Sequence, residues 1–251
     1  MEVIKKVIQN KYKEKLVCEI NKPNRKVNDS VVLILHAFTG KKENKTIHFL
    51  AKKLPEFGFE TIQFDFSGHG ESEGILSEAN ISKQLNDINS VISELGINQK
   101  NLVILGNSFS VITALGFVDK HKEIKGLILT SGRAKYLEYI DNLEQVGVKY
   151  KLFENEFIDE SFIADYKKYN PINNIQRNNQ PVLIIHGTND KVVPVENAQE
   201  FYNSSKSNSK FLVLIKDADH RYSNIEFKEE VLNSCLDFLK NKINNNFLII
   251  N

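Results

Sequence analysis

Residues 102–110 read Leu-Val-Ile-Leu-Gly-Asn-Ser-Phe-Ser, and the rest of the chain is organised around this stretch. The apolar run indicates a buried strand, and the apolar periodicity of residues 109–118 predicts a helix directly after it. So abrupt a turn holds Ser108 in a sterically crowded backbone conformation. The small residues Gly106 and Ser110 on either side reduce the crowding. This pattern is typical of a nucleophile elbow, which projects one side chain above a sheet. The alternative is an ordinary strand-to-helix turn with serine as its N-cap, since serine is favoured there in any α/β protein.

The composition indicates a globular chain with almost no net charge. Its 251 residues allow one large domain or two small ones. A net charge of +1 argues against a nucleic-acid or acidic-membrane partner. The longest aliphatic run, residues 31–35, is too short to span a membrane, and residues 1–6 carry no signal-peptide core. Cys18 and Cys235 are far apart, so we expect buried, unpaired thiols in a reducing, cytoplasmic compartment.

Strand and helix patterns alternate along most of the chain. The strands are expected at residues 1–9, 15–21, 31–35, 60–66, 102–105, 126–130, 182–185 and 211–215. Helical apolar spacing occurs at Ile47, Leu50, Leu54 and Phe57 before the C-cap Gly58, then over 81–95 and 109–118, through Ala198 and Phe201, and over 225–242. Strands separated by helices at this spacing predict an α/β fold, with a mostly parallel sheet and helices on both faces.

The alternation breaks at residues 131–180, which hold many aromatic residues and no clear strand pattern. So long a gap is usually an insertion with a function. We expect a lid over the carboxyl ends of the strands, within a single domain of residues 1–251. The alternative to a lid is a surface segment that has a small core of its own. Ser161 is expected to cap a short helix that ends before Pro171, and the apolar tail 247–250 could dock as an extra turn or strand.

Three reactive side chains follow predicted strands in an order that indicates catalysis. Ligands of an open α/β sheet bind outside the carboxyl ends of its strands, and Ser108, Asp190 and His220 follow three of them in the order of a Ser-acid-His triad. His220 would take the Ser108 proton, and Asp190 would fix the histidine tautomer. An ordinary histidine, with a pKa of about 6.5, is mostly neutral near pH 7. The backbone N–H groups of Phe38 and Phe109 are the expected oxyanion hole.

Other residues compete for these roles. Asp217 and Asp219 are rival candidates for the acid, and His69 is a second-choice base. His36 and His186 directly follow buried strands, and we interpret them as structural hydrogen-bonding residues. The two aspartates and the histidine after them lie close together, but no second cluster has the spacing of a zinc site. We therefore expect neither a metal nor a cofactor.

With these residues, the chain resembles the α/β-hydrolase superfamily, in particular small carboxylesterases of the cinnamoyl (feruloyl) esterase and monoacylglycerol-lipase kind. The resemblance spans residues 31–239 and rests on the segments 36–40, 65–74, 106–110, 186–194 and 219–220. It implies a serine esterase that cleaves a small-molecule carboxylic ester through an acyl-enzyme, without a cofactor. It also implies that the aromatic insertion is the lid that shapes the acyl-binding site.

The sequence departs from this family's pattern at four positions. Ala37 and Ser110 stand where glycine is usual, Asn107 replaces a common histidine, and Ser67 replaces a frequent arginine, which puts a local ion pair in doubt. None of these changes removes a reacting group. A thioesterase or a small serine peptidase with the same triad stays open, as does a catalytically silent binding protein on this fold. A homodimer is compatible with the sequence, which does not set the oligomeric state.

Overall fold

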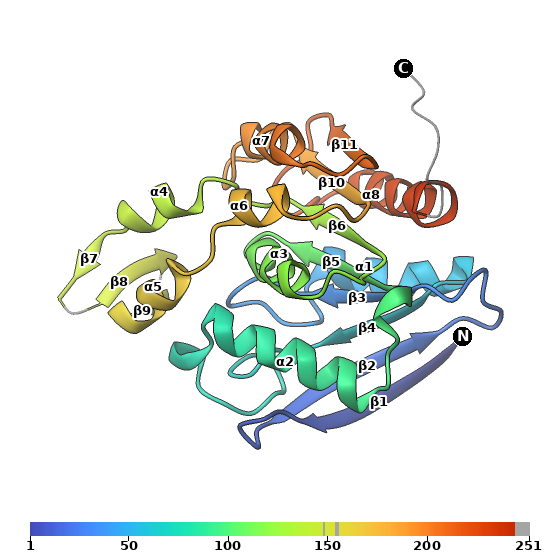
Figure 1. The fold of residues 1–251 in the computed structure, drawn as a ribbon, viewed down its shortest axis with the longest axis horizontal. Helices are drawn as coiled ribbons and strands as arrows, with labels where there is room; N and C mark the ends of the chain where they lie inside the picture. The colour runs from blue at the N-terminus through green and yellow to red at the C-terminus, as the bar shows by residue number, and fades with distance from the viewer. Residues whose placement is uncertain (148, 154–155, 244–251) are drawn as a thin grey trace.

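The computed structural model describes residues 1–147, 149–153 and 156–243. Eight strands form its main sheet: β1 (Glu2–Gln9), β2 (Lys15–Lys22), β3 (Val31–Leu35), β4 (Glu60–Phe64), β5 (Leu102–Asn107), β6 (Gly126–Thr130), β10 (Val182–Gly187) and β11 (Lys210–Ile215). Their order is β1-β2-β4-β3-β5-β6-β10-β11 (Figure 1). β2 pairs antiparallel with β1 and β4, whereas each pair from β4 to β11 is parallel. The predicted α/β fold is confirmed.

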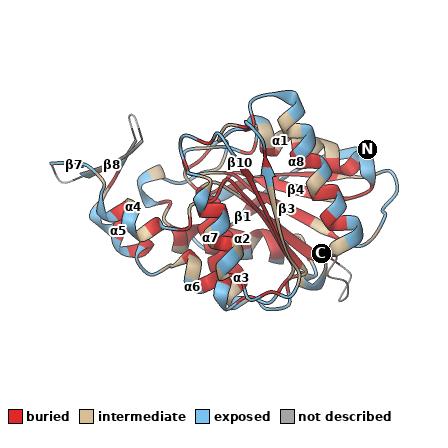
Figure 2. Ribbon diagram, turned by 90° about the horizontal axis from the view of Figure 1, so that it is seen from above, coloured by how far each residue is buried: buried red, intermediate tan, exposed pale blue. Residues whose placement is uncertain are grey.

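Helices cover both faces of this sheet, as the alternation predicts (Figure 2). α1 (Lys45–Lys53) and α8 (Ile225–Asp237) pack on one face, and α2 (Ile81–Glu94), α3 (Ser110–Lys120), α6 (Pro171–Gln176) and α7 (Glu196–Ser204) on the other. In β3, Val32 and Ile34 face α1, while Leu33 and Leu35 face the opposite core, and all four are fully buried. A strand buried on both faces has to be apolar throughout, so its sequence is a continuous apolar run. This run is what predicts β3.

The insertion contains strands that no clear sequence pattern indicates. It comprises α4 (Tyr136–Asp141), a small antiparallel sheet of β7 (Gln145–Val146), β8 (Lys149–Phe153) and β9 (Glu156–Ile158), and α5 (Glu160–Tyr166). The small sheet projects from the body of the molecule (Figures 1 and 2). Strands of two and three residues are too short to show a period of two, which explains why the pattern was missed.

The N-cap of α5 is Asp159, which corrects the prediction that Ser161 caps this helix. The Asp159 side chain accepts a hydrogen bond from the Phe162 backbone N–H at 2.9 Å. The Ser161 hydroxyl donates to the same carboxylate at 2.7 Å and so supports the cap. The helix ends before Pro171, as predicted, and Pro171 begins α6, where its missing N–H does no harm.

Three further expectations concern the ends and the surface of the fold. Cys18 and Cys235 are buried and unpaired, as predicted. The predicted turn or strand at residues 247–250 lies outside the described residues. Among the residues that the structure describes, no helix is long and apolar enough to cross a membrane. A π-helical turn, Phe238–Lys242, continues α8, and short 3-10 turns occur at Leu54–Phe57, Leu76–Glu78 and Gln99–Asn101.

The predicted helix through Phe57 is shorter than expected. α1 ends at Lys53 because Pro55, which lacks an N–H, follows and turns the chain into a 3-10 segment. Phe57 is consequently 41% exposed and not part of the apolar face. Gly58 closes the segment with φ 91°, as the predicted C-cap.

Gly58 and Gly96 both have positive φ but differ in what surrounds them, and this difference gives a test of packing around Gly58. A Cβ at Gly58 would lie 2.5 Å from the Val27 side chain and 3.0 Å from the Arg25 carbonyl, whereas a Cβ at Gly96 would meet nothing within 4 Å. Gly96→Ala should cost only the left-handed strain of about 1–2 kcal/mol, and Gly58→Ala about 1–3 kcal/mol more from overpacking. Urea unfolding of both variants measures this, and equal losses would show that the contacts at Gly58 are unimportant.

Candidate active site

The turn between β5 and α3 holds Ser108 in a left-handed conformation. Its φ is 54°, and its backbone N–H donates to the Thr130 carbonyl at 2.8 Å. A Cβ at Gly106 would lie 2.9 Å from the Ser110 carbonyl oxygen, so only glycine fits there. The N-cap of α3 is Phe109, without a side-chain cap, so Ser108 does not play the ordinary N-cap role.

Ser110 compensates for the missing second glycine of the elbow. It is fully buried, and its hydroxyl donates to the Leu35 carbonyl at 2.9 Å while accepting from the Asn107 N–H at 2.9 Å. The hydroxyl therefore ties the end of β5 to the end of β3. Asn107 in turn accepts a hydrogen bond from the Thr130 hydroxyl at 2.9 Å, which fixes the side chain that stands in place of a histidine.

The structure brings Ser108, His220 and Asp190 together at the carboxyl edge of the sheet. Ser108 Oγ lies 3.0 Å from His220 Nε2, and His220 Nδ1 lies 2.7 Å from Asp190 Oδ2. The carboxylate can only accept, so Nδ1 carries the proton and Nε2 is left to receive the serine proton. The three side chains come from the turns after β5, β10 and β11.

The Asp190 carboxylate is held in a dense set of hydrogen bonds. Its Oδ1 accepts from the N–H groups of Val192 and Val193, both at 2.8 Å. His186 Nε2 lies 3.1 Å from Oδ2, beside the bond to His220. Burial opposes ionisation, but these hydrogen bonds outweigh it and hold the pKa of Asp190 well below its usual range. The carboxylate is therefore ionised at neutral pH and can stabilise a charged imidazole.

The structure does not join either rival acid to the histidine ring by a hydrogen bond. Asp217 is exposed, and its backbone N–H donates to the Thr188 hydroxyl. Asp219 accepts from the N–H and hydroxyl of Ser223 at 2.7 and 2.6 Å, which shapes the turn before α8. Among the described residues, Asp190 is the carboxylate that hydrogen-bonds His220.

His36 and His69 use both ring nitrogens to connect loops. His36 Nδ1 donates to its neighbour's carbonyl at 2.7 Å, and Nε2 accepts from the Phe66 N–H at 3.0 Å. His69 donates to the Ser67 carbonyl at 3.0 Å and accepts from the Thr39 N–H at 3.3 Å. Neither ring has a nitrogen left for Ser108, so the structure does not bring the second-choice base into the site.

Burial of His36 predicts a measurable pH dependence of stability. Burial, assisted by the nearby His69, lowers the pKa of His36 to about 3, whereas an unfolded histidine titrates at about 6.5. The unfolded state therefore binds more protons between these values, and stability is lost as the pH falls through this window. When the pH is lowered from 7 to 5, the free energy of unfolding of His36→Gln should fall by about 2 kcal/mol less than that of the wild type.

Urea unfolding at both pH values measures this difference, with Ser93→Ala, which changes an exposed side chain of α2 that does not titrate, as the control. The control should keep the wild-type pH dependence. An identical pH dependence in His36→Gln and the wild type would contradict the assignment.

The expected oxyanion-hole residues meet at the same edge. Phe109 directly follows Ser108, and its ring centroid lies 4.9 Å from that of Phe38. Both side chains are buried, at 3% and 5% exposure. Neither backbone N–H donates a hydrogen bond to another described residue. A developing oxyanion requires such unused donors, which is the role expected of these two N–H groups.

Sequence reasoning missed a buried ion pair that fixes the loop carrying Phe38. Lys42 is 1% exposed, and its Nζ lies 2.7 Å from Asp65 Oδ2 and also contacts Glu71. The Lys42 N–H donates to the second Asp65 oxygen at 2.7 Å. Burial alone would lower the pKa of Lys42, but the hydrogen bonds to both carboxylates raise it well above its usual value. Lysines are rarely buried, so a sequence alone gives no reason to place Lys42 in the interior.

Ser67, which stands where the family often has an arginine, lies next to the buried Asp87. The N–H and hydroxyl of Ser67 both donate to Asp87, at 2.9 and 2.8 Å. Asn10, in the turn between β1 and β2, donates to the second oxygen at 2.8 Å. Neutral hydrogen-bond donors therefore surround this carboxylate, and burial raises its pKa.

Aromatic rings of the insertion pack against Phe38 and Phe109. We call the buried set Phe38, Phe109, Tyr136, Phe162 and Tyr166 the aromatic cluster. Centroid distances are 5.0 Å between Phe38 and Phe162, and 5.1 Å between Phe109 and Tyr166. These spacings fall in the range of favourable aromatic pairs. The cluster thus joins α4 and α5 to the turn that carries Ser108.

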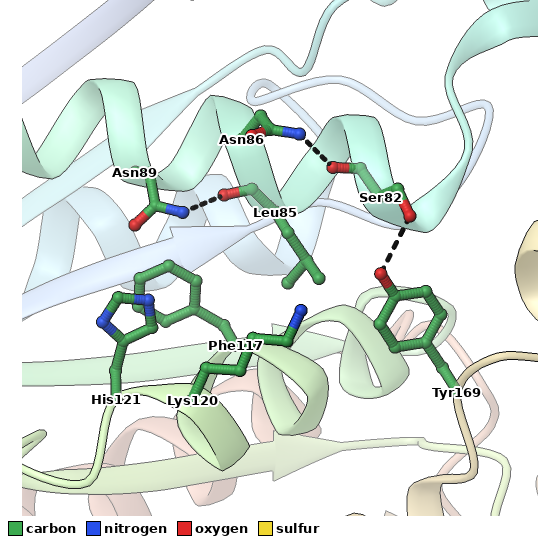
Figure 3. Close-up of a pocket in the computed structure, with 8 residues that line it drawn as sticks. All are labelled: Ser82, Leu85, Asn86, Asn89, Phe117, Lys120, His121 and Tyr169. Carbon is green, nitrogen blue, oxygen red and sulfur yellow. Dashed lines mark hydrogen bonds between the residues drawn. The ribbon is translucent and has the colours of Figure 1, made fainter.

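Asp165 attaches the insertion to the body of the molecule. Its carboxylate accepts from the N–H and the hydroxyl of Ser82, at 2.9 and 2.6 Å, in the first turn of α2. A negative charge is favoured at a helix N-terminus. Nearby, a cavity of about 170 Å³ lies between α2 and α3 (Figure 3), lined by Ser82, Leu85, Asn86, Asn89, Phe117, Lys120, His121 and Tyr169. None of the three residues Ser108, Asp190 and His220 lines it.

This sheet order, with a strained serine between the central strand and its helix, defines a serine hydrolase of the α/β-hydrolase superfamily. The profile of the prolyl oligopeptidase family matches residues 72–246, and the chain belongs to that family. It is 30% identical over 223 residues to the uncharacterized protein YfhR of Escherichia coli O157:H7, covering 84% of this chain and 72% of that protein.

Solved structures with this fold include esterases. Est1E from Butyrivibrio proteoclasticus with bound ferulic acid has a TM-score of 0.83 at 22% identity, covering 96% of this chain and all of that one. The esterase Pf2001 of Pyrococcus furiosus has a TM-score of 0.75 at 24% identity, covering 96% of this chain and 93% of that one. At these identities the likeness establishes the shared fold.

Proposed function

We propose that the protein is a serine esterase in which Ser108 is the nucleophile, His220 the general base and Asp190 the acid that orients it. The observation that carries this proposal is the continuous hydrogen-bond chain from Ser108 Oγ through His220 to Asp190, with distances of 3.0 and 2.7 Å. A neutral serine hydroxyl is a weak nucleophile, so it needs a base within hydrogen-bond reach. The left-handed turn at Ser108 supports the proposal, because such strain collects at functional sites.

The geometry supports a two-step reaction. Ser108 Oγ attacks the ester carbonyl carbon while its proton passes to His220 Nε2. The oxyanion that forms accepts hydrogen bonds from the Phe38 and Phe109 N–H groups. It collapses to an acyl-enzyme, and the departing alcohol takes the proton from the imidazolium. Water then attacks the acyl carbon, again with His220 as base, and releases a carboxylic acid and free Ser108.

We propose a small carboxylic ester as the substrate and residues 131–180 as a lid over it. An aryl or long-chain acyl group attached to Ser108 would lie at the edge of the aromatic cluster, because the buried rings of the cluster pack against Phe38 and Phe109. The likeness to Est1E, whose structure holds ferulic acid, points to cinnamoyl esters, and acylglycerols are the other candidate. The putative esterase YitV of Bacillus subtilis, 25% identical over 209 residues, agrees with ester cleavage.

A small serine peptidase is the second candidate, because the matching family is that of the prolyl oligopeptidases. The triad would be the same, and only the attacked carbonyl would differ. We expect a 4-nitrophenyl ester to be cleaved faster than the thioester with the same acyl group, and both much faster than a peptidyl-proline 4-nitroanilide. Parallel kcat/KM measurements on the three substrates decide this. Faster cleavage of the anilide would make the protein a peptidase.

Removal of the nucleophile tests the proposal directly. Ser108→Ala should lower kcat for 4-nitrophenyl butyrate by roughly 10³-fold or more, because no other group can form the acyl-enzyme. Asp190→Asn should lose on the order of 10⁴-fold through the wrong histidine tautomer.

The matched control is Ser93→Ala, an exposed serine near the end of α2. It should keep the wild-type rate, and circular dichroism should show that all three variants are folded. Undiminished turnover by folded Ser108→Ala would refute the assignment.

A further inference from the structure

We propose that Arg133 binds a carboxylate group of the substrate, so that the enzyme prefers esters carrying a negative charge. This inference rests on the proposed esterase function and names the substrate class of that site. It concerns a residue that neither the triad nor the oxyanion hole uses.

Hydrogen bonds link the chain around Arg133 to the segments that carry the candidate nucleophile and its acid. The Thr130 carbonyl accepts the hydrogen bond from the Ser108 N–H at 2.8 Å, and three further residues of chain, spanning at most about 11 Å, lead to Arg133. The guanidinium donates through Nη2 to the Val192 carbonyl at 2.7 Å. Val192 is two residues after Asp190 and donates its N–H to that carboxylate. The charge is therefore held next to the turn that carries Asp190.

The short linker that carries Arg133 is fixed on both sides. Ser131 is fully buried with φ 49°, and its hydroxyl donates to the Tyr222 hydroxyl at 2.9 Å. The Ala134 N–H donates to the Asn197 side chain at 2.9 Å. A preorganised linker places the guanidinium without an ordering cost when a ligand binds.

Arg133 is partly exposed, and its guanidinium has no counter-charge among the residues that the structure describes. It lies over the Tyr139 ring at 4.2 Å from the centroid, and one of its five N–H donors bonds Val192. In the part of the chain that the structure describes, no carboxylate lies within ion-pair distance of it. By contrast, the exposed Arg177 binds Asp119 through two nitrogens, at 3.1 and 2.6 Å.

These features match a carboxylate ligand with an apolar body. A guanidinium presents its donors as a planar fork that fits a carboxylate through two parallel hydrogen bonds. The partly exposed Tyr139 ring, over which the guanidinium lies, supplies apolar surface next to the charge. An ester with an apolar chain or ring and a carboxylate would use both.

Two substrate pairs that differ only in charge test this inference. One pair is 4-acetoxybenzoate and 4-acetoxybenzamide, with the charge on the alcohol side. The other is the mono-4-nitrophenyl ester of adipic acid and its terminal amide, with the charge on the acyl side. The readout is the ratio of kcat/KM for the charged substrate to that for the neutral one, in the wild type, Arg133→Gln, Arg133→Lys and the control Arg25→Gln. Arg25 is exposed in the loop between β2 and β3.

We expect the wild type to prefer the charged member of at least one pair. The ratio should fall roughly fivefold or more in Arg133→Gln, because a charge-assisted pair is lost. It should be partly retained in Arg133→Lys and unchanged in Arg25→Gln. A ratio in Arg133→Gln equal to that of the wild type for both pairs would overturn the inference. So would a parallel loss on charged and neutral substrates, since that result would make Arg133 a structural tie only.

Binding separates a failure of this inference from a failure of the esterase function. Isothermal titration of folded Ser108→Ala with 4-acetoxybenzoate and with its amide needs no turnover. Tighter binding of the carboxylate that is lost in Ser108→Ala/Arg133→Gln supports the inference even if the wild type cleaves neither ester. Equal binding of the two compounds overturns it. If Arg133→Gln does not fold, Arg133→Lys and the salt dependence decide: the preference should shrink in 0.5 M NaCl, and a preference insensitive to salt overturns the inference.

Discussion

The left-handed backbone at Ser108 is the constraint on which the rest of this site depends. A non-glycine residue at φ 54° costs of order 1–3 kcal/mol, so the surroundings must enforce it. Gly106 lets α3 approach the strand, the Ser110 hydroxyl ties the turn to β3, and the Ser108 N–H is held by Thr130. The same turn that strains the chain directs Oγ toward His220 and leaves the next N–H unused.

Buried charge organises the rest of the carboxyl edge. Asp190 is ionised because backbone N–H groups and two imidazoles surround it. Lys42 and Asp65 form a second buried pair that fixes the loop with Phe38. Breaking such a pair leaves an uncompensated charge in the interior. Two separate electrostatic anchors therefore hold His220 and the loop with Phe38, and the insertion adds aromatic contacts to Phe38 and Phe109.

Much of this arrangement could be predicted from the sequence, and what could not has physical reasons. The parallel strands are buried on both faces, so continuous apolar runs such as residues 31–35 predict them. The order of Ser108, Asp190 and His220 after predicted strands indicates that all three lie at one edge of the sheet. The ion pair of Lys42 depends on contacts far apart in sequence, which no periodicity encodes. The strands β7 and β9 are too short for an alternating pattern, and the helix start at Asp159 was hidden by the neighbouring Ser161, a residue of equal capping propensity.

The central claim is that Ser108 carries the acyl group during turnover. Its most direct test is mass spectrometry of the full chain quenched with acid during steady-state turnover of a slowly deacylating aryl ester, followed by peptide mapping. The account predicts an added acyl mass on the peptide that contains Ser108, and its disappearance as the ester is consumed. An acyl group mapped to another residue, or continued turnover with no acylated peptide, would contradict it.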